Sequence, residues 1–253
     1  DRLRSRGLGD VYKRQVSAGL ILIHLLRRKD ECRVSLKDIR FHRHAAISIL
    51  MLGIPAGIQN AIFAIANLFV QTGVNSFDTV MVSGSTAATN ADTLIFNVMY
   101  AFYTGCSSFM SQNYGARNKK RVLKSYFISL FYSFTTGLIL GLLLFIFGHQ
   151  FMSLFATDAA VIDAGMQRIK IMAFSYCVSA FMDCTIAASR GLGKTVIPTI
   201  IIILGSCVFR IVWIYTIFAW IHTIPALFLL YLFSWIITSI AEIIYFIIIY
   251  RKL

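Results

Sequence analysis

The sequence predicts an all-α integral membrane protein, with six transmembrane helices in a bundle and a truncated helix before them. Hydrophobic residues make up 58% of the chain and charged residues 14%, and the mean hydropathy is +0.73. These values are far more apolar than those of a soluble domain. Apolar segments of about 20 residues, enough to cross a bilayer, recur along the chain. Basic residues gather in alternate loops between them.

The first 44 residues divide into three short parts. Residues 1–15, DRLRSRGLGDVYKRQ, are charged and aperiodic and resemble the spurious ends of assembled reads, so we expect a non-native leader. Residues 16–26 are apolar but reach only about half the length of a span, which indicates the remnant of a transmembrane helix. Residues 27–44 form a basic linker, expected in the cytoplasm, before the main lobe at 45–253. His42 and His44 in this linker lack further ligands, so no metal site is expected.

The first complete span covers about residues 45–75. Pro55 lies near its start and removes a backbone donor, so we expect a kink there. The polar residues of this span share an arc of about 80° on the helix: Asn60, Asn67, Gln71 and Asn75. Two interpretations stay open, hydrogen bonding between helices or the lining of a water-filled pathway.

The second span lies in the stretch Asn90–Lys124 and follows a predicted loop, Ser76–Ala88, rich in Ser, Thr and Gly. Its polar residues also share one face, an arc of about 60°: Asn90, Thr93, Asn97, Thr104, Ser108 and Ser111. The stretch ends in a basic cluster. We therefore expect a second helix with one wet side and a cytoplasmic end.

The third and fourth spans differ in polarity. The third, at about 126–147, carries small residues and no charge, which favours close helix packing. After a predicted loop at Gly148–Gly165, the fourth span at about 169–188 aligns Ser175, Ser179 and Asp183 on one face. A carboxylate within a span is a functional hypothesis by default. The alternative is an ion pair of this carboxylate with Arg190 or Arg210.

The last two spans each carry a buried charge. Arg210, in the fifth span at about 196–218, lies too deep to be only an end anchor. The sixth, at about 226–250, groups several residues within an arc of about 80°: Tyr231, Trp235, Thr238, Glu242 and Tyr245. Aromatic residues around one carboxylate could hold a flat organic cation, or they could form a belt at the membrane interface.

The charge pattern fixes the expected orientation and excludes several functions. The basic loops are predicted to be cytoplasmic, which places the C-terminus in the cytoplasm. The net charge of +13 lies in these loops, so nucleic acid is not an expected partner. The five cysteines include no CxxC pair. No HExxH or GxSxG set is present, and the phosphate-loop match ending at 193–195 lacks its first glycine, so no enzyme is expected.

Three motifs resemble the C-terminal lobe of a multidrug and toxic compound extrusion (MATE) transporter. They are GIPAGIQNAIFAIANLFVQTGVNSF at 53–77, SQNYGARNKKRV at 111–122 and ASRGLGKTVIP at 188–198, in that family's order and spacing. Members of the Na⁺-coupled branch of that family carry a glutamate in the helix that corresponds to the first span. Here this span has no glutamate, and Phe63 stands near the corresponding position. This departure resembles the DinF-like branch, where the coupling carboxylate is expected in the N-terminal lobe.

The resemblance implies a twelve-helix antiporter of two lobes in a plasma membrane, of bacterial type. Such a transporter exports organic, often cationic, compounds by alternating access, driven by H⁺ or Na⁺, without a bound cofactor or metal. The implied partners are the lipid bilayer, small organic substrates and the N-terminal lobe. The alternatives are a lipid-linked saccharide flippase of the same superfamily and a non-transporting membrane scaffold.

Together these observations predict two groups of functional residues. The substrate and ion pathway comprises Asn60, Asn67, Gln71, Asn97, Thr104, Ser179, Asp183, Arg210 and Glu242. The cytoplasmic motif that the resemblance implies comprises Gln112, Asn113, Gly115, Ala116, Arg190 and Gly191.

Overall fold

The computed structural model describes residues 2–30, 33–35 and 40–253, with side chains omitted for 2–11 and 13. The chain divides into two units, residues 1–48 and 49–253, which we describe separately. In the first unit, α1 (Arg2–Arg27) is one helix. It therefore continues through the boundary between residues 15 and 16, where the sequence changes character. The foreign origin of residues 1–15 stays a prediction.

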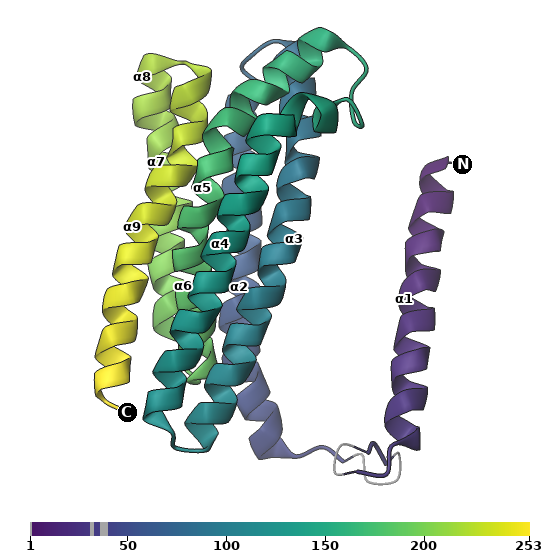
Figure 1. The fold of residues 1–253 in the computed structure, drawn as a ribbon, viewed down its shortest axis with the longest axis vertical. Coiled ribbons are helices and arrows are strands. Elements are labelled where there is room, and N and C mark those ends of the chain that lie inside the picture. Colours follow the sequence, from purple (N-terminus) through teal and green to yellow (C-terminus); the bar gives the residue numbers. More distant parts are fainter. Residues whose placement is uncertain (1, 31–32, 36–39) are drawn as a thin grey trace. The chain divides into compact units, whose positions relative to one another are not determined.

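The second unit is a bundle of long helices (Figure 1). They are α2 (Arg43–Val74), which begins in the first unit, α3 (Thr79–Gly115), α4 (Lys119–Met152), α5 (Ala159–Gly191) and α9 (Ile224–Arg251). Between α5 and α9 runs a helical segment made of α6 (Val196–Ile202), the π-helix η2 (Ile203–Val208), α7 (Phe209–Trp213), the π-helix η3 (Ile214–Phe218) and α8 (Ala219–Ile221).

Within the described residues, five helical segments are long and apolar enough to cross a membrane: α2, α4, α5, the segment Val196–Ile221 and α9. The remaining predicted span, the second in chain order, corresponds to α3, which is 37 residues long and lies in the same bundle (Figure 1). Its polar face keeps it below the apolarity of the other five. α2 continues through Pro55, and the kink there stays a prediction.

The helices extend well into two segments that the sequence predicts as loops. Where we expected a loop at Ser76–Ala88, α3 already begins at Thr79, capped by the Asp78 carboxylate, which accepts the Met81 N–H at 2.8 Å. In the predicted loop Gly148–Gly165, α4 continues to Met152 and α5 begins at Ala159. Both loop predictions were too long.

Helix packing explains why these Gly-rich and Ser-rich segments are helical. A Cβ atom added to Gly84 would lie 2.6 Å from both the Gly165 nitrogen and the Val161 oxygen. A Cβ on Gly165 would lie 2.8 Å from the Gly84 oxygen. The two glycines therefore let the backbones of α3 and α5 approach closely, as small residues do between membrane helices.

Helix α5 is the centre of the bundle. It packs against α3, α4 and α9. In its most apolar window 67% of the residues are buried, against 11% in α2. Small and polar side chains such as Ser175, Ser179 and Thr185 are completely buried along it. Side chains on α5 are thus the ones best placed to meet residues from several helices at once.

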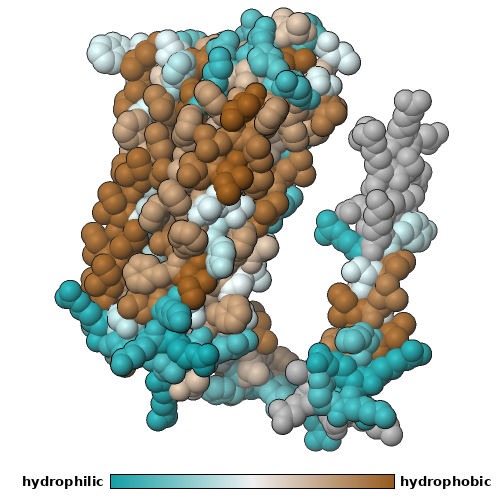
Figure 2. All heavy atoms as spheres, viewed as in Figure 1, coloured by the Kyte–Doolittle hydropathy of each residue, from teal (hydrophilic) through white to brown (hydrophobic). Residues whose placement is uncertain are grey.

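The outside of the bundle carries an apolar band. Large apolar side chains are exposed along α4, among them Phe127, Phe131, Ile139 and Ile146. Figure 2 shows hydrophobic residues covering the middle of the bundle and hydrophilic residues gathered at its two ends. An apolar surface this extensive is unusual for a soluble protein and suits contact with lipid.

The close approach of α3 and α5 predicts a sharp difference between two glycines of α3. Gly84→Ala should lower stability by about 1–3 kcal/mol, or roughly 2–10 °C in the midpoint of thermal unfolding in detergent, because the new methyl group meets backbone atoms. Gly105→Ala is the matched control, because no described atom outside the neighbouring backbone of its own helix lies within 4 Å of its added Cβ. Equal midpoints for the two variants would contradict this account of the packing.

Candidate functional site

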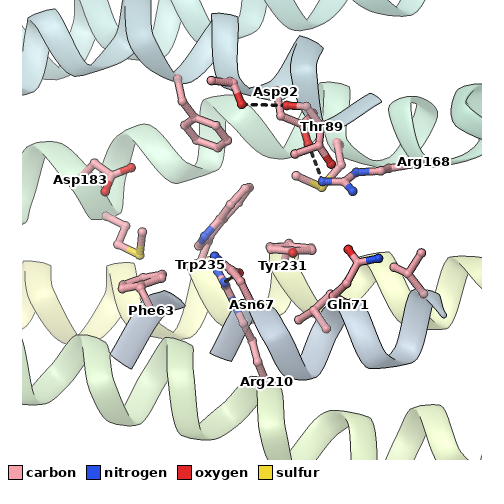
Figure 3. Close-up of a pocket in the computed structure, with 16 residues that line it drawn as sticks. Phe63, Asn67, Gln71, Thr89, Asp92, Arg168, Asp183, Arg210, Tyr231 and Trp235 are labelled. Carbon is pink, nitrogen blue, oxygen red and sulfur yellow. Dashed lines mark hydrogen bonds and ion pairs between the residues drawn. The ribbon is translucent and has the colours of Figure 1, made fainter. Parts of the chain in front are cut away.

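A polar cavity of about 400 Å³ lies among the helices of the second unit (Figure 3). Its labelled lining residues are Phe63, Asn67 and Gln71 from α2, Thr89 and Asp92 from α3, Arg168 and Asp183 from α5, Arg210 from α7, and Tyr231 and Trp235 from α9. Aromatic rings and four charged side chains thus share one space. We call it the central cavity.

An ion pair joins α3 to α5 at the wall of the central cavity. Arg168 Nη2 donates to an Asp92 carboxylate oxygen at 2.6 Å, and the Tyr176 hydroxyl donates to the other oxygen. Arg168 Nη1 donates to Ser85 Oγ at 2.9 Å. The Arg168 and Asp92 side chains are only 10% and 6% exposed, so each charge is compensated mainly by its partner.

Sequence reasoning missed this ion pair. Arg168 precedes the predicted start of its span by one residue, and Asp92 lies near the start of the stretch that follows the predicted loop. Each therefore looked like a residue of a span end. The available signal was that a carboxylate and a guanidinium fell near the same end of two neighbouring spans, where such groups tend to pair.

The second guanidinium in the central cavity, Arg210, is held differently. It is 2% exposed, and its Nη1 donates to Asn67 Oδ1 at 3.1 Å. Its guanidinium carbon lies 4.5 Å from the ring centroid of Tyr231 and 5.3 Å from that of Phe63, within cation–π range. Figure 3 shows the side chain reaching from α7 toward Asn67. Among the described residues, no carboxylate forms an ion pair with it within 4 Å.

Asp183 faces two cavities. It lines the central cavity and a second cavity of about 420 Å³, which is also lined by Asn60, Thr104 and Arg190. The positive charges of Arg190 and Arg210 both act on its carboxylate. Neither arginine forms an ion pair with it within 4 Å in the described part of the chain. The Tyr103 hydroxyl also acts on this carboxylate, which lies where the two cavities meet.

A cluster of polar residues from four helices lies beside the second cavity. Arg190 Nη2 donates to Gln59 Oε1 at 2.6 Å, and Thr199 Oγ1 donates to the same oxygen at 3.5 Å. Glu242 is completely buried, and its two carboxylate oxygens have no hydrogen-bond partner among the residues that the structure describes. Arg190 acts on it electrostatically. The sequence left open whether Asp183 forms an ion pair with Arg190. It does not, because Arg190 donates its hydrogen bond to Gln59. Gln59 lies off the predicted polar stripe of its helix, so that pattern does not reveal it.

The structure brings six of the nine predicted pathway residues to the two cavities. The central cavity has Asn67, Gln71, Asp183 and Arg210, and the second cavity has Asn60, Thr104 and again Asp183. Asn97 is exposed and lines neither cavity. Ser179 is buried, and its hydroxyl donates to the Tyr176 carbonyl of its own helix at 2.8 Å. A pathway role for these two residues and for Glu242 stays a prediction.

Of the α9 aromatic residues grouped with Glu242 in the prediction, Tyr245 lies close enough to interact with it, whereas the other two face elsewhere. Tyr231 and Trp235 line the central cavity, together with Asp183 and Arg210. Glu242 lies about two helical turns beyond Trp235, outside that cavity. The aromatic side chains and the carboxylate that could hold an organic cation together are therefore those of Tyr231, Trp235 and Asp183.

The residues of the predicted cytoplasmic motif build the turn between α3 and α4. Where α3 ends after Gly115, the Ala116 N–H donates to the Gln112 carbonyl at 3.0 Å and the Arg117 N–H donates to the Tyr114 carbonyl at 2.9 Å. The Asn113 side chain donates to the Phe109 carbonyl at 2.7 Å and to Ser125 Oγ at 3.2 Å.

The remaining motif residues lie at the end of α5. Arg190 holds Gln59, and an added Cβ on Gly191 would lie 2.6 Å from the Ser107 oxygen. Gly193 follows α5 with φ of 74°, a left-handed conformation in which glycine ends a helix without strain. These motif residues thus fix how the helices end and how closely they pack.

Comparisons with known proteins agree on one family. The MatE family model matches residues 55–216. The chain is 23% identical over 209 residues to the probable multidrug resistance protein NorM of Thermotoga maritima, covering 79% of this chain and 43% of that protein. It is 30% identical over 128 residues to the probable multidrug resistance protein YpnP of Bacillus subtilis, covering 51% of this chain and 29% of that protein.

Solved structures share the fold. A multidrug resistance MATE family transporter of the MOP superfamily, in an outward-facing conformation, matches with a TM-score of 0.84 at 18% identity, over 94% of this chain and 54% of that one. A MOP superfamily transporter from Pyrococcus furiosus, described as having a binding pocket of reverse polarity that suggests a different function, matches with a TM-score of 0.81 at 19% identity, over 93% and 54%. The chain spans about half the length of these relatives.

The buried ion pair makes a prediction about stability. Asp92→Asn should lower the free energy of unfolding by about 3–5 kcal/mol, because Arg168 is left buried without its counter-charge. The double variant Asp92→Asn/Arg168→Met should lose less than the sum of the two single variants, because it leaves no unpaired charge. Chemical unfolding in detergent measures these values.

The matched control is Asp163→Asn, the same change on the same helix. Its side chain is 70% exposed and lies 3.8 Å from His149, so its effect should be within about 0.5 kcal/mol. If Asp92→Asn is as mild as this control, the pair does not have the role we assign to it.

Proposed function

The chain belongs to the MatE family, and from this we propose that it is the C-terminal lobe of a multi-pass secondary transporter that exports small organic compounds, many of them cationic. The function is transport and not catalysis. Export would be driven by antiport with H⁺ or Na⁺. The membrane involved would be a plasma membrane, because the curated relatives include bacterial multidrug resistance proteins.

The observation that carries this proposal is Asp183 in the central cavity. Its carboxylate has no ion-pair partner within 4 Å among the described residues, and the aromatic rings of Phe63, Tyr231 and Trp235 line the same space. Aromatic faces together with a carboxylate suit flat organic cations. An unpaired intramembrane carboxylate also suits the uptake of H⁺ or Na⁺.

These two uses of Asp183 are mutually exclusive, which is the basis of antiport. A coupling cation on the carboxylate removes the charge that attracts a cationic substrate, and a bound substrate blocks the coupling cation. Because Asp183 lines both cavities, either ligand could reach it from two directions. Alternating exposure of the site then converts this competition into transport.

The N-terminal lobe is the partner that the proposal requires. The chain spans 54% of the outward-facing relative, and in transporters built from two repeats the substrate site lies at the repeat interface. We propose that the central cavity forms one wall of that site and that the other lobe closes it. The exposed apolar band meets the lipid bilayer.

Dye export tests the function. The full-length transporter containing this chain should lower ethidium accumulation in an efflux-deficient bacterial host. Asp183→Asn and Asn67→Ala should each reduce export by about tenfold, which corresponds to the loss of roughly 1.4 kcal/mol of binding. Initial efflux rates from preloaded cells measure the effect, with membrane protein levels checked by immunoblot.

Asp163→Asn, the exposed carboxylate on the same helix, should leave export unchanged. If Asn67→Ala, Asn97→Ala and Asp183→Asn all export like the wild type, the pathway assignment is wrong. Movement of a lipid-linked saccharide without dye export would identify a flippase. The absence of both activities would leave a membrane scaffold.

We further propose that the C-terminus lies in the cytoplasm, because the basic loops share its side of the predicted topology. Lys252→Cys should react with an impermeant maleimide only after cells are permeabilised. Leu154→Cys is the control. Leu154 follows the C-terminal end of α4, in a loop that the predicted topology places outside the cell, and is 74% exposed. This cysteine should react in intact cells. The reverse pattern of labelling would invert the topology.

A further inference from the structure

We propose that Arg210 forms an anion-binding site in the central cavity, which takes a carboxylate or a comparable anionic group of an aromatic compound. The inference rests on the proposed function, because it assumes that the central cavity receives substrates. It adds a recognition group to that function: the guanidinium that would hold the anionic group of a substrate.

The first argument is that the Arg210 guanidinium is left with unused donors. Within the part of the chain that the structure describes, it makes one side-chain hydrogen bond, to Asn67, and its buried Nε has no partner. Asp183, the carboxylate that shares the cavity, acts on Arg210 only from beyond ion-pair distance in the described part of the chain, and a buried cation without a counter-charge in contact with it is costly. Arg168, the other guanidinium of the cavity, has a carboxylate partner and two further acceptors on Ser85. Arg210 is therefore the guanidinium available to a ligand.

The second argument is the setting of the guanidinium plane. The ring centroids of Tyr231 and Phe63 lie 4.5 and 5.3 Å from the guanidinium carbon, and Asn67 accepts a hydrogen bond from Nη1 at one edge of the plane. Such a fixed, planar fork binds carboxylate and phosphate groups bidentately. The same aromatic side chains, with Trp235, line the cavity beside it. A ligand with an aromatic ring next to an anionic group matches both features.

The third argument is the backbone that carries Arg210. α7 lies between the π-helices η2 and η3, and π-helical turns within α-helices occur frequently at functional sites. The segment is also tightly fixed to α9. A Cβ on Gly205 would lie 2.6 Å from Thr238 Oγ1, and Trp213 Nε1 donates to the Ala226 carbonyl at 2.8 Å. The backbone of Arg210 is thus fixed against α9 by contacts before it and after it in the chain.

A purely structural role is the alternative explanation, since Arg210 links α7 to α2 and α9. The two roles predict different results. A structural arginine affects folding and leaves the charge preference of ligand binding unchanged. A binding arginine determines whether the cavity prefers an anionic compound to its neutral analogue.

The experiment measures binding of 2-naphthoate and of its neutral methyl ester. The full-length transporter is reconstituted in phosphatidylcholine nanodiscs, and both affinities are obtained by equilibrium dialysis. The wild type should bind naphthoate at least about tenfold more tightly than the ester, as expected for a charge-assisted hydrogen bond. Arg210→Met should lose this preference and keep its affinity for the ester. Arg210→Lys should keep a smaller preference, because it retains the charge without the planar fork.

Arg251→Met is the control, the same substitution at an exposed arginine at the end of α9, and should keep the full preference. Folding of each variant is checked by its thermal midpoint. If Arg210→Met does not fold, Arg210→Lys decides, and it must show a reduced preference. A wild type without preference, or a folded Arg210 variant with the full preference, would overturn the proposal.

Two further measurements show which of the two proposals has failed and whether the bound anion comes from a lipid. Dye export by a wild type that shows no anion preference would refute this inference and leave the proposed function intact, whereas an Arg210-dependent preference without export would do the reverse. A lipid phosphate offers the same chemistry as a soluble anion. If phosphatidylglycerol in the nanodisc displaces naphthoate from the wild type, the anionic group bound at Arg210 includes that of a lipid.

Discussion

Backbone contact between α3 and α5 is the constraint on which the rest of this structure depends. Gly84 and Gly165 bring the two helices together at one end, and Gly191 meets Ser107 at the other. With α3 this close, Asp92 reaches Arg168 and α5 is buried on most of its sides. Polar side chains of α5 such as Ser179 and Thr185 are then buried inside the bundle. Small residues thus determine where the charged ones can stand.

The charges inside the bundle form a graded set. Among the described residues, three carboxylates and three guanidinium groups are buried or line the two cavities described above: Asp92, Asp183, Glu242, Arg168, Arg190 and Arg210. Asp92 and Arg168 are in direct contact, whereas Asp183 and Glu242 interact with Arg190 only at longer range. Direct pairs stabilise a fixed arrangement, whereas loosely compensated charges can respond to a ligand. In the central cavity, the paired Asp92 and Arg168 therefore belong to the fixed wall, whereas Asp183 and Arg210 are the groups that we propose bind ligands.

The apolar spans, the polar stripe of α2 and the location of Asp183 and Arg210 within spans could be predicted from the sequence, because each depends on composition or on helical periodicity. The bonding partners could not. Whether Arg190 meets Asp183 or Gln59 depends on how α2 is rotated against α5, and no local pattern encodes that rotation. The loop predictions around Gly84 and Gly165 failed for a related reason: glycine and serine are typical of turns in water and of helix contacts in a membrane.

The π-helical turns on either side of α7 make the direction of Arg210 depend on residue count as well as on residue type. A π-helical turn holds more residues than an α-helical turn, and each residue added to or removed from an α-helix rotates everything after it by about 100°. A relative that differs by a single residue within η2 would carry the same arginine pointing away from the cavity. Insertions and deletions in this segment are therefore a route by which the ligand range of such proteins can diverge while their site residues stay the same.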